Sequence, residues 1–393
     1  MNNKRHIAAR MNDIQPFHVM ALLGRARELE AEGRDIVHME IGEPDFTTAQ
    51  PIIDAGIRAL QNGQTHYTPS IGLPALREAI SVFYQQHYSI DVPASRIVIT
   101  PGASGALQLI FNTLINPGDS VLMADPGYPC NRHFVRLNEG EAIGIPVNAG
   151  SNYQLTAELV EQHWSESTVA AMLASPSNPT GTIVTANDLR DIHAVTQKRG
   201  GQLVVDEIYH GLVYDEDISS ALALEADDVF VINSFSKYFG MTGWRVGWLV
   251  APTDYIDAID RLAQNIFLAA STPAQHAALA AFEPESLVIH EQRRADFAAR
   301  RDYLLPALRD LGFDIPVTPQ GAFYLYADCS RFTDDSFHFA GQLLEEAGVA
   351  ITPGKDFGFY KPEQHVRFAY TTSLENLQKG VERIKGFLDK NSF

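Results

Sequence analysis

Between about residues 95 and 250 the chain alternates short runs of apolar residues with turn residues and longer amphipathic stretches. Several runs, such as Val229-Phe230-Val231-Ile232, contain no polar position. A strand with this pattern has both faces covered, as in the parallel sheets of α/β proteins. The pattern predicts seven strands, at residues 97–100, 120–124, 142–147, 169–174, 203–206, 229–234 and 246–250. We therefore expect an α/β fold built on a mostly parallel seven-stranded sheet with helices on its faces.

The pattern changes after about residue 284, where a long charged helix is expected over residues 285–311. Its arginines are expected to line a solvated face: Arg293, Arg294, Arg300 and Arg301. The elements expected beyond it indicate a smaller α+β unit, with strands near 322–326 and 366–370 and helices over 337–347 and from about 372. We predict an N-terminal segment (1–45) that packs with the small domain, a large domain (46–283) and a small C-terminal domain (284–393).

The composition argues against several classes of function. Asp and Glu outnumber Lys and Arg by 48 to 30, and the formal net charge of −18 disfavours a nucleic-acid surface. Cys130 and Cys329 are far apart and no His-Glu-x-x-His occurs, so neither a disulfide framework nor a metal site is expected. No stretch approaches the roughly 18 apolar residues of a membrane-spanning helix. We expect a soluble, unprocessed, cytoplasmic protein without a nucleic-acid or membrane partner.

A lysine directly after the predicted strand at 229–234 carries the strongest chemical signal. Lys237 stands just past the end of an apolar strand, where loss of water favours the neutral, nucleophilic amine. Such an amine can form an imine with an aldehyde. Arg245 offers a fork of donors that suits a phosphate, and Ser234 and Ser236 supply hydroxyl groups nearby. An aldehyde and a phosphate on one ligand indicate pyridoxal 5'-phosphate.

Further candidates follow the other predicted strands, because ligands of open α/β sheets lie beyond the carboxyl ends of the strands. Gly102, Ala103 and Ser104 lie in a run of small residues that leads into a helix-like stretch over residues 106–114, so free backbone amides could face a phosphate, although Ser104 would equally serve as a helix N-cap. Tyr128 lies between prolines and a glycine and could stack on the pyridine ring, or could be a structural turn residue. Asn178, in the turn Ser-Asn-Pro-Thr-Gly, presents both a donor and an acceptor.

Asp206 emerges from an apolar strand, and a buried carboxylate needs a cationic or donor partner to stay ionised. A protonated pyridine nitrogen is such a partner, and its charge makes the ring an electron sink. The alternative is that Asp206 caps a helix. Tyr209 could donate to the phenolic oxygen of the ring.

These residues together resemble the signature of class I and II pyridoxal-phosphate-dependent aminotransferases of fold type I. The pattern around Lys237 reads Ser-x-Ser-Lys-x-x-x-x-x-Gly-x-Arg-x-Gly, and Tyr128, Asn178, Asp206 and Tyr209 precede it in the family's order. The segments Ile-Gly-Glu-Pro-Asp-Phe at 41–46 and Tyr-Thr-Pro-Ser-Ile-Gly-Leu-Pro-Ala-Leu-Arg at 67–77 resemble the subgroup with bacterial aspartate, aromatic, alanine and kynurenine-type aminotransferases.

The resemblance implies a homodimer in which Tyr67 reaches the phosphate bound by the neighbouring subunit. It also implies that Arg367 binds the substrate carboxylate as a bidentate fork, with Gly42 and Asn178 beside it. Candidates for the substrate pocket are Phe17, Ile41 and Phe323. Taken alone, Arg367 would pass for a surface charge, and the three pocket candidates would pass for core or interface residues.

We expect a ping-pong transamination that moves an amino group from an L-amino acid to a 2-oxo acid through a Schiff base on Lys237, with Asp206 and Tyr209 assisting. A carbon–sulfur β-lyase on the same cofactor site is the alternative. A non-catalytic DNA-binding sensor is disfavoured by the net charge. Some members with acidic substrates carry a lysine where Ser104 stands, so the sequence favours a neutral or aromatic amino donor over aspartate.

Overall fold

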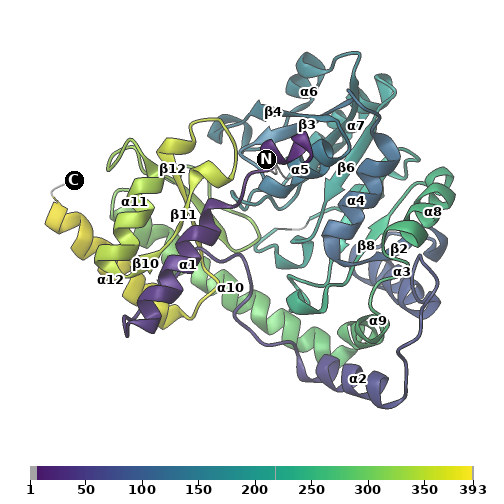
Figure 1. The fold of residues 1–393 in the computed structure, drawn as a ribbon, viewed down its shortest axis with the longest axis horizontal. Coiled ribbons are helices and arrows are strands. Elements are labelled where there is room, and N and C mark those ends of the chain that lie inside the picture. Colours follow the sequence, from purple (N-terminus) through teal and green to yellow (C-terminus); the bar gives the residue numbers. More distant parts are fainter. Residues whose placement is uncertain (1–6, 217, 392–393) are drawn as a thin grey trace, which may run out of the picture.

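The computed structural model describes residues 7–216 and 218–391 (Figure 1). Its largest sheet contains seven strands, which lie side by side in the order β2 (Ile97–Thr100), β8 (Gly247–Val250), β7 (Val229–Ser234), β6 (Gln202–Asp206), β5 (Thr168–Ala174), β3 (Ser120–Asp125) and β4 (Glu141–Pro146). β8 runs antiparallel to both its neighbours, and the other pairs are parallel. The predicted mostly parallel seven-stranded sheet is confirmed, and each strand end lies within one residue of its predicted place.

Two apolar layers explain why strands such as β7 have no polar positions. Phe230 and Ile232 belong to a buried cluster on one face of the sheet, together with apolar residues of α4 (Gly102–Leu114) and α8 (Ile256–Ile266). Val229 and Val231 belong to a separate cluster on the other face, which includes residues of α3 (Pro74–Tyr88), α6 (Ala157–His163), α7 (Ala186–Lys198) and α10 (Pro284–Asp310). Because successive strand residues point to opposite faces, a sheet covered twice needs apolar residues at every position.

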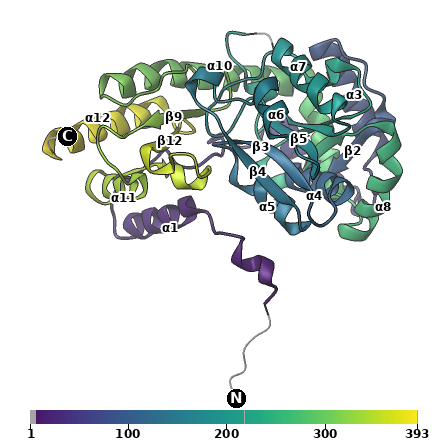
Figure 2. The same ribbon diagram turned by 90° about the horizontal axis from the view of Figure 1, so that it is seen from above.

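A smaller group of elements lies at one end of the molecule. β9 (Tyr324–Asp328), β12 (His365–Ala369) and β11 (Thr352–Pro353) form an antiparallel sheet, and β1 (Val37–His38) pairs in parallel with β10 (Val349–Ala350). Figure 2 shows α1 (His18–Ala31), α11 (Ser336–Gln342) and α12 (Leu374–Asn391) at this end, with α10 running from them toward the large sheet. The N-terminal segment thus pairs with chain more than 300 residues away. The domain boundaries themselves stay predictions.

The prediction that the arginines of α10 are solvated is wrong for Arg300 and Arg301, which are 7% and 5% exposed. Arg300 makes a bidentate ion pair with Asp45, with N–O distances of 2.8 and 3.0 Å. Arg301 is paired with Asp215 and Asp302. Helical spacing shows which residues share a face of α10. It does not show that the segments carrying Asp45 and Asp215 cover the face with Arg300 and Arg301.

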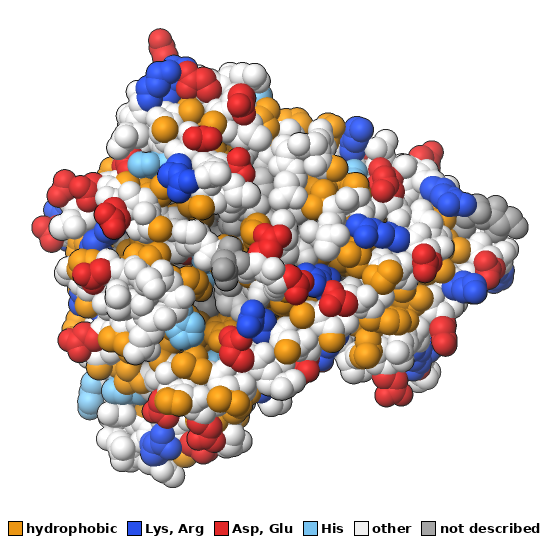
Figure 3. All heavy atoms as spheres, turned by 180° about the vertical axis from the view of Figure 1, so that it is seen from behind, with side chains coloured by type: hydrophobic (Ala, Val, Ile, Leu, Met, Phe, Trp, Pro, Cys, Tyr) orange, Lys and Arg blue, Asp and Glu red, His pale blue; other side chains and the backbone are white. Residues whose placement is uncertain are grey.

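The remaining outer surface carries charges of both signs. Acidic and basic side chains are interspersed over the face in Figure 3, with hydrophobic side chains between them. Among the helices of residues 7–216 and 218–391, none is long and apolar enough to cross a membrane. The same residues contain no group of three or more His, Cys, Asp or Glu side chains arranged to hold a metal ion.

Candidate active site

A cavity of about 310 Å³ lies where the carboxyl ends of the parallel strands meet the smaller group of elements. It brings together twelve of the predicted site residues: Gly42, Ala103, Ser104, Tyr128, Asn178, Asp206, Tyr209, Ser234, Ser236, Lys237, Arg245 and Arg367. Phe17 and Ile41 also line it. Phe323 does not, since it is fully buried behind the wall. Gly102 lies beneath the lining, in contact distance of Arg245.

Lys237 lies in the turn after β7 and points into the cavity. Its Nζ donates a hydrogen bond of 2.7 Å to the carbonyl oxygen of Gly42 and lies 5.7 Å from the ring centres of Tyr209 and Phe323. Burial lowers the pKa of the Lys237 amine to about 8, and the charges of Arg367 and Arg245 act in the same direction. A sizeable fraction of this amine is therefore neutral, and nucleophilic, near neutral pH.

Asp206 faces the cavity from the end of β6 and is 6% exposed. Its Oδ1 accepts a hydrogen bond of 3.1 Å from the Ile208 amide, and burial raises the pKa of the Asp206 carboxyl to about 6 against the opposing effects of that amide and of Lys237. The alternative of a helix cap is wrong, because the next element is a single 3₁₀ turn at His210–Leu212 that begins after Tyr209. No ion pair to Asp206 occurs among the described residues, and Lys237 is the cation whose charge acts on it.

A candidate anion site lies at the start of α4. This helix begins at Gly102, four residues earlier than predicted, because a glycine at φ 68° lets the strand turn directly into the helix. No side chain caps α4, so its first N–H groups are free. A Cβ at Gly102 would lie 2.6 Å from Nη2 of Arg245, and one at Gly247 would lie 2.9 Å from the backbone carbon of Gly102. Only glycines allow this close approach.

Two hydroxyl groups and a cation belong to the same candidate anion site. Ser234 donates a hydrogen bond of 3.0 Å to Ser236, and both hydroxyls line the cavity. Arg245 is exposed and donates through Nη1 to the carbonyl of Thr242 at 3.0 Å. The alternative that Ser104 caps α4 is wrong, since Pro101 is at the N-cap position and Ser104 lies inside the first turn.

Arg367 reaches the cavity from β12. Nη1 donates to Oδ1 of Asn178 at 2.9 Å, and Nη2 donates to the carbonyl of Glu40 at 2.6 Å. The guanidinium lies 4.3 Å from the ring centre of Tyr324, and its Nε has no hydrogen-bond partner in the described structure although it is buried. An unpaired N–H on a buried fork is suited to a carboxylate.

Tyr324 is a site residue that the sequence did not indicate, because an aromatic residue in a predicted strand looks like core. Its hydroxyl lies 2.8 Å from that of Tyr209. Tyr324 also explains why residue 42 is glycine, since a Cβ at that position would lie 2.2 Å from the Tyr324 hydroxyl. Tyr128 is 37% exposed at the mouth of the cavity, and its ring lies 6.5 Å from that of Phe17.

Asp356 is a second residue that the sequence missed. Its carboxylate accepts hydrogen bonds from the amides of His18 at 2.6 Å and Val19 at 2.8 Å, which are in the first turn of α1. A carboxylate at this place satisfies free amides and the positive end of the helix dipole. The contact fixes the start of α1, and with it Phe17, over the cavity.

Removing this cap is expected to change both stability and substrate binding. Asp356→Ala should lower the free energy of unfolding by about 1–2 kcal/mol, because two amides lose their acceptor, and it should raise KM for amino donors because Phe17 is no longer fixed. Thermal unfolding and steady-state kinetics measure the two effects. Asp335→Ala is the matched control: Asp335 accepts from the amides of Phe337 and His338 at the start of α11, away from the cavity. A KM change of equal size in the control would refute the assignment.

Tyr67 does not reach the cavity of its own chain and is 82% exposed. Its predicted role depends on a second subunit, so it stays a prediction.

Comparison with known proteins agrees with the geometry. A family model described as aminotransferase class I and II matches residues 34–384. The chain is 38% identical over 386 residues to the (5-formylfuran-3-yl)methyl phosphate transaminase of Methanocaldococcus jannaschii, covering 98% of this chain and 100% of that protein. It is 36% identical over 376 residues to the valine–pyruvate aminotransferase of Mycobacterium tuberculosis, covering 95% and 97%.

Among solved structures, an aminotransferase from Mycobacterium tuberculosis matches with a TM-score of 0.95 and 36% identity, covering 98% of this chain and 100% of that one. Each of these three similar proteins transfers amino groups by name, and none is a lyase. The alternative of a β-lyase therefore has no support. With the family match spanning nearly its whole length, the chain belongs to the aminotransferase class I and II family and is an enzyme that transfers amino groups.

Proposed function

We propose that this enzyme binds pyridoxal 5'-phosphate in the 310 Å³ cavity and moves amino groups between L-amino acids and 2-oxo acids. The observation that carries the proposal is the presence in one cavity of an amine of lowered pKa, Lys237, and a buried carboxylate without an ion pair among the described residues, Asp206. A protonated heterocycle that carries an aldehyde satisfies both groups, because the aldehyde links to the Lys237 amine and the ring charge pairs with the Asp206 carboxylate. The family membership of the chain implies the same cofactor.

The residues present fit the cofactor. The free amides at the start of α4, the Ser234 and Ser236 hydroxyls and Arg245 would hold the phosphate, and the close backbone approach at Gly102 and Gly247 leaves room for it. Asp206 would hold the pyridine nitrogen in its protonated form. Tyr128 would lie against the ring, and the paired Tyr209 hydroxyl would donate to the phenolic oxygen.

When bound, pyridoxal phosphate supplies an aldehyde that links to amino groups and an electron-withdrawing ring that stabilises negative charge at the substrate Cα. Lys237 Nζ, once displaced from its hydrogen bond to Gly42, is the base that takes the proton from Cα. In the second half of the reaction the same amine returns a proton to Cα of the incoming 2-oxo acid. Its lowered pKa suits both directions, since neither protonation state is strongly favoured near pH 8.

Arg367 and Asn178 would hold the substrate carboxylate, with Gly42 beside it. The unpaired Nε shares one edge of the guanidinium with Nη2, and the N–H groups on that edge are the parallel donors that a carboxylate accepts, while Nη1 donates to Asn178 beside them. This contact fixes the Cα–H bond relative to Lys237, and orientation of that kind accounts for a large share of the rate enhancement in enzymes.

The cavity wall favours an apolar or aromatic amino donor over aspartate. Apolar side chains line the side nearest α1, namely Phe17, Val19, Met20, Leu23 and Ile41. Similar proteins are named for a phosphorylated furan aldehyde, for valine and pyruvate, and for aspartate, so the family alone leaves the side chain open. A screen of amino donors against pyruvate and 2-oxoglutarate, read by cofactor absorbance, tests the proposal. Protein that stays colourless with pyridoxal phosphate, and inactive with every donor, would refute it.

We also propose a cytoplasmic homodimer in which Tyr67 of each subunit completes the phosphate site of the other. Exposed apolar side chains support a contact surface, since Ile57 and Leu60, in the helix that precedes Tyr67 in the chain, and Leu268 are about half exposed. Both cysteines are free, which fits a reducing compartment.

The dimer makes a testable prediction. Tyr67→Phe should leave the sedimentation mass at twice the chain mass. It should weaken the binding of pyridoxal phosphate by about tenfold, because one hydrogen bond to a charged group is lost. Analytical ultracentrifugation and equilibrium dialysis measure the two. A monomeric wild-type protein with full activity would exclude the shared site.

A further inference from the structure

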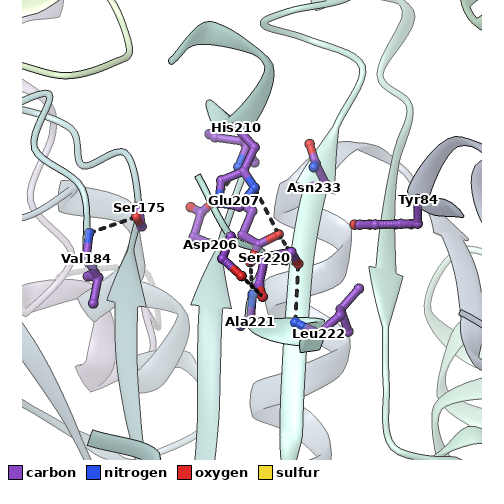
Figure 4. A network of polar contacts seen from close by, with 12 residues as sticks. Tyr84, Ser175, Val184, Asp206, Glu207, His210, Ser220, Ala221, Leu222 and Asn233 are labelled. Atoms are coloured by element: carbon purple, nitrogen blue, oxygen red, sulfur yellow. Dashed lines mark hydrogen bonds and ion pairs between the residues drawn. The ribbon is translucent and has the colours of Figure 1, made fainter. Parts of the chain in front are cut away.

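Glu207 follows Asp206 at the end of β6 but lies on the other side of the chain. Asp206 lines the cavity, whereas Glu207 does not. Figure 4 shows Glu207 among His210, Ser220 and Ala221, and it is 1% exposed. Two consecutive carboxyl groups are therefore buried within one strand end, one of them with a role proposed above and the other without.

Glu207 joins three separate pieces of backbone. Its Oε1 accepts a hydrogen bond of 2.7 Å from the Ala221 amide, and Ser220 donates to Oε2 at 2.8 Å. The Glu207 amide donates to the carbonyl of Ile232 on β7 at 2.8 Å, and its carbonyl accepts from the His210 amide at 2.9 Å. The side chain thus joins the turn after β6 to residues 220–221, while the backbone of Glu207 joins the same turn to β7.

No lysine or arginine among the described residues is paired with this carboxyl group. The nearest basic side chain is His210, whose Nδ1 lies 3.4 Å from Oε2. Burial lowers the pKa of the His210 imidazole to about 3, so the ring is neutral near pH 7. The other titratable groups that face Glu207 are Asp206 and the phenols of Tyr84 and Tyr88, and burial raises the pKa of both phenols. An ionised Glu207 would therefore be a buried charge without a cation, which is strongly unfavourable.

We propose that Glu207 is a neutral carboxylic acid in the folded protein and acts as a positioning residue for Asp206. It holds the turn after β6 through Ala221 and Ser220, and it leaves Asp206 as the carboxylate that carries charge at this strand end. A free acceptor lies near the acid proton, because Nδ1 of His210 is 3.4 Å from Oε2 and has no hydrogen-bond partner in the described structure. In agreement, burial raises the pKa of the Glu207 carboxyl to about 8 against the opposing effects of the hydrogen bonds from Ala221 and Ser220, and the charge of Asp206 acts in the same direction as burial. The positioning role depends on the proposed function of Asp206, whereas the protonation state does not.

The protonation state can be tested on the cofactor-free protein. Between pH 4.5 and 8 the folded chain keeps a proton on Glu207 that the unfolded chain has lost, so this group lowers stability as pH rises through that range. Glu207→Gln keeps the shape and the donor of the acid but does not titrate. Between pH 6.5 and 8, above the pKa of about 6 of Asp206, the Tm of Glu207→Gln should rise relative to wild type by about 2 °C. Glu158→Gln is the control at an exposed glutamate, and its Tm difference from wild type should stay constant between pH 6.5 and 8.

Two outcomes would overturn the assignment of a neutral carboxylic acid to Glu207. A Tm difference that stays flat or falls between pH 6.5 and 8 would show that Glu207 is ionised in the folded protein. If Asp206→Asn removed the pH dependence in this window and Glu207→Gln did not, the proton would belong to Asp206.

The positioning role is tested by equilibrium dialysis of pyridoxal phosphate at pH 7. Glu207→Gln should bind within about twofold of wild type, whereas Glu207→Ala, which leaves Ala221 and Ser220 without their acceptor, should bind about tenfold more weakly. Equal binding by wild type and Glu207→Ala would overturn the positioning role and leave the aminotransferase assignment intact. If Glu207→Ala does not fold, Glu207→Asp, which is one methylene too short to keep both contacts, takes its place. Failure of wild type to bind pyridoxal phosphate would overturn the proposed function and the positioning role together, while the Tm measurement would still decide the protonation state.

Discussion

Replacing Lys237 with alanine is expected to lower kcat for transamination by at least about 10⁴-fold, because one amine supplies both the covalent link to the cofactor and the proton transfer at Cα. Borohydride reduction followed by mass spectrometry should attach pyridoxal phosphate to wild type and not to the variant. The folded state should be preserved, since the substitution removes a buried amine whose hydrogen bond is to the carbonyl of Gly42.

Lys198→Ala is the control for this experiment, because Lys198 is a largely exposed lysine paired with Glu161 on the surface. The Lys198→Ala variant should keep full activity, and borohydride reduction should attach pyridoxal phosphate to it as it does to wild type. A Lys237→Ala variant that retained more than about a hundredth of wild-type turnover would show that another group moves the proton.

Replacing Arg367 with lysine is expected to lower kcat/KM for amino acids by about 10²–10³-fold, mainly through KM. Lysine keeps the charge but cannot offer two parallel donors to a carboxylate, and the lost hydrogen bonds correspond to about 3–4 kcal/mol. The variant should also lose its preference for an amino acid over the matching amine without a carboxylate, for example phenylalanine over phenylethylamine. That ratio separates a carboxylate contact from general damage.

Arg301→Lys supplies the control, since Arg301 is buried to the same extent and paired with Asp215 and Asp302 but does not line the cavity. The Arg301→Lys variant should lose stability but keep the wild-type ratio of kcat/KM for the amino acid to kcat/KM for the matching amine. If both variants changed the ratio alike, Arg367 would not be the carboxylate-binding residue.

The large sheet could be predicted because its cause is local. A strand covered on both faces needs apolar residues throughout, and this pattern appears in the residues themselves, so every strand end was placed within one residue. Lys237 and Asp206 could be placed for the same reason, since parallel strands bring their carboxyl ends to one edge.

The parts that could not be predicted depend on contacts between distant segments. Asp356 caps a helix that begins 338 residues earlier, and nothing near Asp356 in the sequence indicates that partner. Arg300 looked solvated because its helix is charged, and the partner that buries it, Asp45, lies 255 residues away. The start of α4 was placed four residues late because an apolar run marks where a helix is buried, whereas Gly102 marks where the backbone turns.

The pairing of β1 with β10, together with the cap from Asp356, has a consequence for biosynthesis. The N-terminal segment leaves the ribosome first, yet its strand partner is residues 349–350 and its helix cap is residue 356. The chain must therefore be translated through residue 356 before residues 18–38 can dock. A nascent chain arrested upstream of residue 349 should hold a folded central sheet while residues 18–38 remain open to protease, and the synthesis of residues 349–356 allows α1 to close over the cavity.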